Sequence, residues 1–152
     1  MNPMNQADQA LIDRLRTITP ANGYLTDIGN RVRAGYLGAL IDSEEAVFPL
    51  ITIQPDECQP AKQDGFDFIA PLGRKVIGVA DESAGLDALN DIYCDLLRCL
   101  VTPGGLPNPW GRQGPYRVTF GAPQQFLADH EIPKGTVVVP LHLHVIINGE
   151  HA

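Results

Sequence analysis

The sequence predicts an α+β fold in which two helices pack on one face of a mixed, mainly antiparallel sheet of about five strands. Two segments place apolar residues at helical spacing, and five shorter segments have the composition or alternation of strands. Along the chain they follow the order helix, β, β, β, helix, β, β. Two helices cannot cover both faces of such a sheet, so we expect the other face to be solvated or pressed against another subunit. With 152 residues, the chain is the size of a single domain, 1–152.

The first predicted element is a helix over residues 5–18, with Asn5 as its N-cap and Pro20 after its end. Its apolar residues recur at helical spacing: Ala7, Leu11, Leu15 and Ile18. A short strand is expected around residues 31–36 and a second over 48–54. The apolar run of the second strand is typical of a sheet that is covered on one face and partly on the other.

Residues 56–72 are polar and irregular, and we expect them to form a projecting arm. Phe66 and Phe68 alternate with polar residues in this arm, as in a hairpin. A third strand is predicted over 74–80 and a second helix over 83–100. The helix has an apolar stripe (Leu86, Leu89, Tyr93, Leu96 and Leu100), and its polar residues lie off the stripe (Asp87, Asn90, Asp91 and Asp95).

Residues 102–115 form a Pro- and Gly-rich loop, predicted to be a second arm, which contains the single tryptophan, Trp110. A long loop in a compact domain usually has a function. Strands are predicted over 116–120 and 136–147. The last strand alternates between one face (Val137, Val139, Leu141, Leu143, Val145 and Ile147) and the other (Pro140, His142 and His144). Because proline cannot donate to a ladder, Pro140 favours an edge position or a bulge.

The charge balance limits the classes of partner. Lys and Arg number 11 and Asp and Glu number 18, which gives a net charge of −7. A protein that grips a phosphate backbone by charge normally has the opposite balance, so we do not expect specific nucleic-acid binding. No stretch approaches about 18 consecutive apolar residues, and the first residues are polar. We therefore expect no membrane-spanning helix and no secretory signal, and a chain that stays in the cytoplasm where it is made.

The three cysteines, Cys58, Cys94 and Cys99, are odd in number and show no CxxC spacing. We interpret them as buried thiols in a reducing compartment, because a disulfide framework uses an even number and a zinc site uses closely spaced pairs.

His142 and His144 are the sharpest chemical signal in the chain. Histidines at i and i+2 project from the same side of a strand, where they could grip a metal. With Gly135 and Glu150, the run faintly resembles the first metal-binding motif of cupins, and His130 is a candidate third ligand. The spacings to Gly135 and Glu150 are slightly longer than that motif requires. We therefore favour histidines on a solvent or subunit-contact face, with a cupin-like metal-dependent enzyme as the alternative.

No other group of residues assembles a recognisable active site. Ser43 and Ser83 lie outside any nucleophile elbow, and the glycines of the 102–115 loop form no P-loop. We therefore predict that the protein is not an enzyme and that it holds no metal and no cofactor.

Six residues are candidates for a subunit or partner interface: Phe66, Phe68, Trp110, Arg112, His142 and His144. Tryptophan and arginine are enriched at interface hot spots, and Trp110 and Arg112 lie on a long loop. Alternatively, Trp110 folds back and fills the edge of its own core. Phe66 and Phe68 favour an interface, since exposed aromatic residues on an unsupported arm promote aggregation unless a partner covers them.

The layout of the whole chain resembles the tail terminator proteins of tailed bacteriophages. The resemblance begins with three segments in the first quarter of the chain: 9–15, 21–29 and 32–35. It continues through Phe48-Pro49-Leu50-Ile51-Thr52-Ile53 with Pro55-Asp56-Glu57, then Arg74–Val79, the acidic helix behind it and the long final strand. The 102–115 loop and the paired histidines have no counterpart in this resemblance.

This resemblance implies a small α/β subunit that forms a homohexameric ring on the last ring of the tail tube. The ring ends polymerisation of the tube protein and offers a docking surface to the head-side connector or neck protein. Genomic DNA is expected to pass through the bore without specific binding, because acidic residues there would repel phosphates. The implied location is the neck region of the virion tail, assembled in the host bacterial cytoplasm. A head-closure or tail-completion protein of the neck is the alternative.

Overall fold

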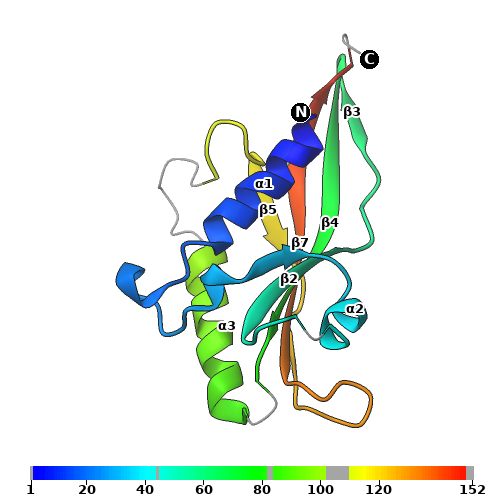
Figure 1. Cartoon of the computed structure of the whole chain (residues 1–152). Coiled ribbons are helices and arrows are strands. Elements are labelled where there is room, and N and C mark those ends of the chain that lie inside the picture. The colour runs from blue at the N-terminus through cyan, green and yellow to red at the C-terminus, as the bar shows by residue number, and fades with distance from the viewer. Residues whose placement is uncertain (1, 44, 82–83, 102–109, 150–152) are drawn as a thin grey trace.

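The structure is a computed structural model, and it describes residues 2–43, 45–81, 84–101 and 110–149. Within these residues the helices pack on a single sheet (Figure 1), so the predicted α+β class is confirmed. The α-helices are α1 (Pro3–Leu15), α2 (Leu37–Ile41) and α3 (Leu86–Leu100), and short 3₁₀ helices lie at Pro20–Asn22 and Ile28–Asn30. The strands are β1 (Val32–Ala34), β2 (Leu50–Pro55), β3 (Lys62–Asp64), β4 (Asp67–Val79), β5 (Arg117–Phe120), β6 (Gln124–Phe126) and β7 (Thr136–Asn148).

The sheet is five strands wide, in the order β1-β2-β4-β7-β5. The short strands β3 and β6 extend its edges, because β3 pairs with β4 beyond the end of β2 and β6 pairs with β7 beyond the end of β5. β1 runs parallel to β2, and the other pairs are antiparallel. The predicted mixed, mainly antiparallel sheet of about five strands is therefore confirmed, although β3 and β6 change the predicted order of elements.

The two long helices, α1 and α3, cover one face of the sheet, as predicted (Figure 1). Alternate residues of β7 face them and are buried: Val137, Val139, Leu141, Leu143 and Val145. On the same face, Arg74 of β4 donates two hydrogen bonds to the carboxylate of Asp8 in α1, at 2.8 and 3.0 Å. Apolar packing and this ion pair together fix α1 across the sheet.

The opposite face is covered over only part of its length. The unpredicted helix α2 packs Leu37 and Leu40 against a small second core formed by Leu50, Ile77 and Val79. α2 has five residues and no side-chain cap, so its apolar residues give too short a pattern to predict a helix. The expectation of a wholly uncovered face is therefore corrected to a half-covered one.

The first helix begins two residues and ends three residues earlier than predicted. Asn2, not Asn5, is the N-cap: its Oδ1 accepts a hydrogen bond from the backbone N–H of Asn5 at 2.8 Å. Pro3 follows at the first helical position, where its missing N–H costs nothing. Ile18 lies beyond the end of α1 but is still fully buried.

The buried side of α3 is also rotated from the predicted stripe. Leu86 is exposed and Tyr93 is half-buried, whereas Ile92, Asp95 and Cys99 are buried. The main difference concerns Asp95. The sequence pattern predicts that this residue lies off the apolar stripe, whereas in the structure its carboxylate is fully buried. It accepts hydrogen bonds from the backbone N–H of Leu25 at 3.0 Å and from Thr26 N–H and Oγ1 at 2.8 and 2.7 Å. Asp95 thereby ties the loop after the first 3₁₀ helix to α3.

Pro140 lies in the interior of the sheet and not at an edge. Its carbonyl oxygen accepts a hydrogen bond from Gly121 N–H at 2.9 Å. In an antiparallel ladder the nitrogen and the carbonyl of one residue point to the same neighbouring strand, so the Pro140 nitrogen also faces the β5–β6 side. On that side the ladder is interrupted between Phe120 and Gln124. The missing N–H of Pro140 therefore falls at this break in the neighbouring strand.

The cysteines differ from the prediction: Cys58 and Cys94 are exposed, and Cys99 is buried. Burial raises the pKa of the Cys99 thiol, which donates to the Arg14 carbonyl oxygen at 3.2 Å.

None of the helices in the described part of the chain has the length and apolar character needed to cross a membrane.

Candidate interaction surface

The half of the second sheet face that α2 leaves uncovered is the main candidate site, and we call it the open sheet face, although Pro71 and Gly73 within it are buried. Residues directly opposite each other in a ladder project to the same side, so the strand register defines its rows. Four cross-strand rows lie beyond the part that α2 covers: Lys62–Ile69–Ile146, Pro71–His144–Arg117, Gly73–His142–Thr119 and Gln54–Lys75–Pro140. Both predicted interface histidines lie on this face.

The connection from β2 to β3 crosses the edge of the open sheet face at Gly73. A side chain at Gly73 would collide with the carbonyl oxygen of Glu57, so this crossing requires a glycine. The Glu57 carbonyl oxygen lies 3.1 Å from His142 Nε2, at hydrogen-bonding distance. His142 is thus held by the backbone of its own chain.

His144 is held by different neighbours. Its Nε2 lies 2.9 Å from Thr119 Oγ1, and its ring meets the Tyr116 ring edge-on with centroids 6.0 Å apart. The two imidazoles therefore make separate contacts and do not converge on one point. Among the described residues, no group of three His, Cys, Asp or Glu side chains could hold a metal ion. The described strands also form one open sheet, not the double-sheet jelly roll of cupins, so the fold gives no support to that resemblance.

The surroundings of His144 lower its pKa below the usual 6.5. Burial is the largest cause, followed by the cationic charges of Arg117 and His142. The folded protein therefore disfavours the protonated imidazole. The contribution of His144 to the free energy of unfolding is fully present above about pH 6.5, and it is lost as the pH falls through the lowered pKa of the folded state.

We expect the substitution Arg117→Gln to raise the pKa of His144 towards its ordinary value, since it removes a nearby positive charge. Titration of the imidazole by NMR measures this directly. Lys75→Gln is the matched control, because it removes a cation from the same face that does not act on His144. An unchanged His144 pKa in the Arg117 variant, or an equal rise in both variants, would contradict this account.

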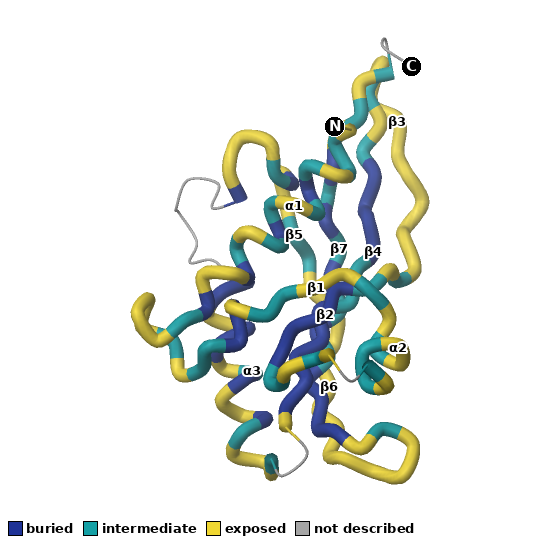
Figure 2. The backbone as a smooth tube through the Cα atoms, in the orientation of Figure 1, coloured by how far each residue is buried: buried dark blue, intermediate teal, exposed yellow. Residues whose placement is uncertain are grey.

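Phe66 and Phe68 lie at the far end of the long β4–β7 pair. β3 and β4 form a hairpin whose two-residue turn is Gly65-Phe66, with Gly65 at φ +63°. Phe66 is 73% exposed and Phe68 is 39% exposed, which confirms the predicted aromatic hairpin. The predicted arm over 56–72 is corrected in part, because residues 67–72 belong to β4 and extend the sheet without interruption. Figure 2 shows the exposed β3 beside the buried middle of β4.

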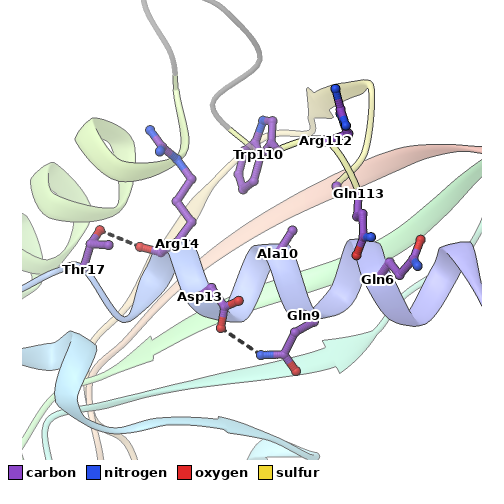
Figure 3. A pocket seen from close by; sticks show the side chains of 11 residues that line it. Gln6, Gln9, Ala10, Asp13, Arg14, Thr17, Trp110, Arg112 and Gln113 are labelled. Atoms are coloured by element: carbon purple, nitrogen blue, oxygen red, sulfur yellow. Dashed lines mark hydrogen bonds between the residues drawn. The ribbon is translucent and has the colours of Figure 1, made fainter. Parts of the chain in front are cut away.

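Trp110 follows the second of its two predicted alternatives. It is 8% exposed and belongs to the main core, with the Arg14 guanidinium 5.3 Å from its ring centroid. Trp110 and Gln113 face α1 across an open pocket of about 710 Å³, and the Arg112 side chain points away from the helix (Figure 3). Arg112 is exposed at this pocket. The predicted loop residues 102–109 lie outside the described residues, so the second arm is described only from Trp110 onwards.

An apolar border along the β5–β6 side of the sheet was missed by sequence reasoning. Its members are large side chains that are about half exposed: Tyr116, Phe120, Phe126, Leu127 and Ile146. The signal in the sequence was the pair Phe126-Leu127 in a polar segment, but β6 is too short to be predicted as a strand. By the strand register, Phe120 projects to the helix-covered side and Phe126 and Ile146 project to the other side, so these residues follow the edge of the sheet on both of its faces.

Comparison of the sequence with protein-family models gave no match, and comparison with curated proteins gave none either.

Proposed function

We propose that this protein is a tail terminator of a tailed bacteriophage. In this role, copies of the chain form a hexameric ring on the last ring of the tail tube. The ring stops polymerisation of the tube protein and presents a docking surface to the head-side connector. The protein acts by geometry and not by catalysis.

The observation that carries this proposal is the half-covered sheet. A sheet normally buries both faces or solvates one with polar residues, whereas the open sheet face mixes Ile69, Pro140 and Ile146 with cationic side chains. The apolar β5–β6 border adjoins it. Surfaces of this kind are suited to contacts with other protein chains.

A closed ring also requires two different contact surfaces on each subunit. The exposed phenylalanine hairpin lies at one end of the β4–β7 pair, and the connection between β6 and β7 lies at the other (Figure 1). These two ends are separate surfaces, which supports the proposal of a ring with two different contacts on each subunit. Its net charge of −7 suits a ring through which DNA passes without sticking, provided that acidic residues line the bore.

The test is to polymerise the tail tube protein of the same genome with and without this chain and to examine the products by electron microscopy. We expect tubes of limited length that carry an additional ring at one end. Bovine serum albumin at the same concentration is the control for nonspecific effects. Tubes that grow equally long with and without the chain, and carry no added ring, would rule the proposal out.

A further inference from the structure

Two strands at opposite edges of the sheet have no strand on their outer side in the described part of the chain. β5 ends the strand order on one side, and β3 lies outside β4 on the other. Edge strands carry unpaired backbone N–H and C=O groups, which pair readily with a strand of another chain. All three residues of β3 are exposed and β5 is only partly buried, so both edges are open to a partner.

The hydrogen-bond pattern of β5 shows which of its backbone groups face outward. In an antiparallel pair, residues that bond to the partner strand alternate with residues whose N–H and C=O groups point the other way. Just after β5, Gly121 donates to the Pro140 carbonyl oxygen at 2.9 Å, so the odd-numbered residues of β5 bond to β7. Val118 and Phe120 therefore direct their backbone groups to the free edge.

The same reasoning applies to β3 on the other side of the sheet. The odd-numbered residues of β4 bond outward, as Pro71 does when its carbonyl oxygen accepts from Gln59 N–H at 3.2 Å. The even-numbered residues of β3 pair with such residues and therefore bond inward. The backbone groups of Ala61 and Gln63 face the free edge.

The strand directions suit a contact that repeats from copy to copy. β5 is antiparallel to β7 and β7 is antiparallel to β4, so β5 runs parallel to β4, whereas β3 runs antiparallel to β4. When two copies lie side by side in the same orientation, β5 of one therefore meets β3 of the next as an antiparallel pair. Neighbouring copies in a ring have this relation, and the two edges are different surfaces, as a ring requires.

The charges on the two edges select one register. Arg117 and Asp64 are both exposed, and the ladders place them on the same side of the sheet as the open sheet face. The outward backbone groups of β5 and β3 match when Arg117 lies opposite Lys62 or opposite Asp64. Opposite charges directly across a pair are stabilising and like charges are destabilising, so Asp64 is the partner.

Each of these two side chains also lacks an opposite charge across its own ladder. Arg117 lies opposite His144, and Asp64 lies opposite Asp67. A carboxylate from the next copy would offset the positive charge around Arg117, and the guanidinium would offset the repulsion between the two aspartates. The contact would thus improve the electrostatics of both edges.

The register also gives the geometry of a closed sheet. Through the ladders, Arg117 is level with Pro71 of β4 and Asp64 is level with Asp67, four residues away. Pairing them shifts each copy along the strands by about 13 Å, at about 3.3 Å per residue. The four strands β3, β4, β7 and β5 span about 19 Å at a spacing of about 4.8 Å. The resulting strand tilt is about 35°, as in sheets that close into barrels.

We propose that β5 of one copy pairs antiparallel with β3 of the next copy, with Arg117 opposite Asp64. The sheet then continues from one subunit to the next. This inference rests on the proposed ring function and names the contact between its subunits. Two backbone-bonded pairs follow from the register: Val118–Gln63 and Phe120–Ala61.

The direct test combines Arg117→Cys and Asp64→Cys in a chain that also carries Cys58→Ser and Cys94→Ser, because those two native cysteines are exposed. In the proposed pair the two Cα atoms lie about 4.5 Å apart, within reach of a disulfide. Within one chain they are roughly 19 Å apart, so a disulfide must join two copies. We expect oxidation of rings assembled with the tube protein to give a ladder of linked copies in non-reducing electrophoresis.

The matched control combines Arg117→Cys with Lys62→Cys in the same background. In the proposed register these two positions are diagonal neighbours about 7–8 Å apart, beyond the reach of a disulfide. We expect no ladder from this variant. A ladder from the control in place of the test variant would show the other register.

Charge reversal tests the same pair without cross-linking. Arg117→Asp and Asp64→Arg each place like charges opposite each other, and each should weaken the association of copies about tenfold or more. The two substitutions together exchange the partners and should restore association. Analytical ultracentrifugation with the tube protein present measures the concentration at which copies associate.

Three results would overturn this contact while leaving the ring function intact. They are rings that form without the 117–64 disulfide, a control that cross-links as well as the test variant, and a double reversal that associates no better than the single variants. If no copies associate at all, the proposed function fails together with the contact.

Discussion

The substitution Trp110→Ala is expected to lower the free energy of unfolding by about 3–5 kcal/mol, the usual cost of truncating a buried aromatic residue to alanine. The Trp110 side chain is almost fully buried and belongs to the core around α1 and β7. Its removal also takes away the aromatic face over which the Arg14 guanidinium lies. Chemical denaturation of the purified chain measures the loss.

Arg112→Ala is the matched control for this prediction, because Arg112 lies two residues away at the same pocket and is exposed. Its free energy of unfolding should stay within about 0.5 kcal/mol of the original. If the Trp110 variant is as stable as the Arg112 variant, Trp110 is not a core residue and its role must be sought at an interface.

The substitution Asp95→Ala is expected to cost about 3 kcal/mol or more. The buried carboxylate accepts three hydrogen bonds from Leu25 and Thr26, and each bond to a charged group contributes about 1.5–3 kcal/mol. Its loss leaves two backbone N–H groups without their acceptor. Because Leu25 is exposed, water replaces part of this interaction, so the loss stays below the sum of the three bonds.

Asp91→Ala, on the exposed side of the same helix, is the control for Asp95 and should change stability little. Asp95→Asn should fall between the two, since the amide keeps an acceptor but not the charge. Hydrogen exchange at the amides of Leu25 and Thr26 adds an independent measurement and should become faster in the alanine variant. Equal stability of the Asp91 and Asp95 variants would refute the structural role given to Asp95.

The parts of the fold that sequence patterns predict are those with long periodic signals. The alternation in β7 identifies its buried face from Val137 to Val145, because thirteen residues of a strand give many repeats of the pattern. The five-residue α2 and the three-residue β3 and β6 give too few repeats to be recognised. α2 forms against Leu50, Ile77 and Val79, and β3 and β6 form by pairing with the long strands β4 and β7, so each depends on a partner outside its own short pattern.

The corrections within predicted elements have a common physical cause. Asp95 was placed away from the core because it is charged, yet three donors from a distant loop make its burial favourable. Pro140 was expected at an edge or bulge, yet a break in the neighbouring strand accommodates its missing N–H inside the sheet. In both cases the decisive partner comes from another part of the chain, which local patterns do not reveal.

The candidate surface was predicted in part. Phe66 and Phe68 are exposed at a hairpin, and His142 and His144 project from one side of β7, as their spacing indicates. The apolar pocket between α2, β6 and β7 was not predicted, because Leu37 is distant in the sequence from Phe126 and Val138 and meets them only in the folded protein.

The central claim is that this chain acts as a closed ring of identical subunits. The most direct measurement is the mass of the particle that forms at the end of the tube, obtained by native mass spectrometry after the tube protein is dissociated. A subunit of 16.5 kDa predicts a closed species of about 99 kDa, which corresponds to six copies. A mass of 16.5 kDa at every concentration, even after assembly with the tube protein, would contradict the ring and the function built on it.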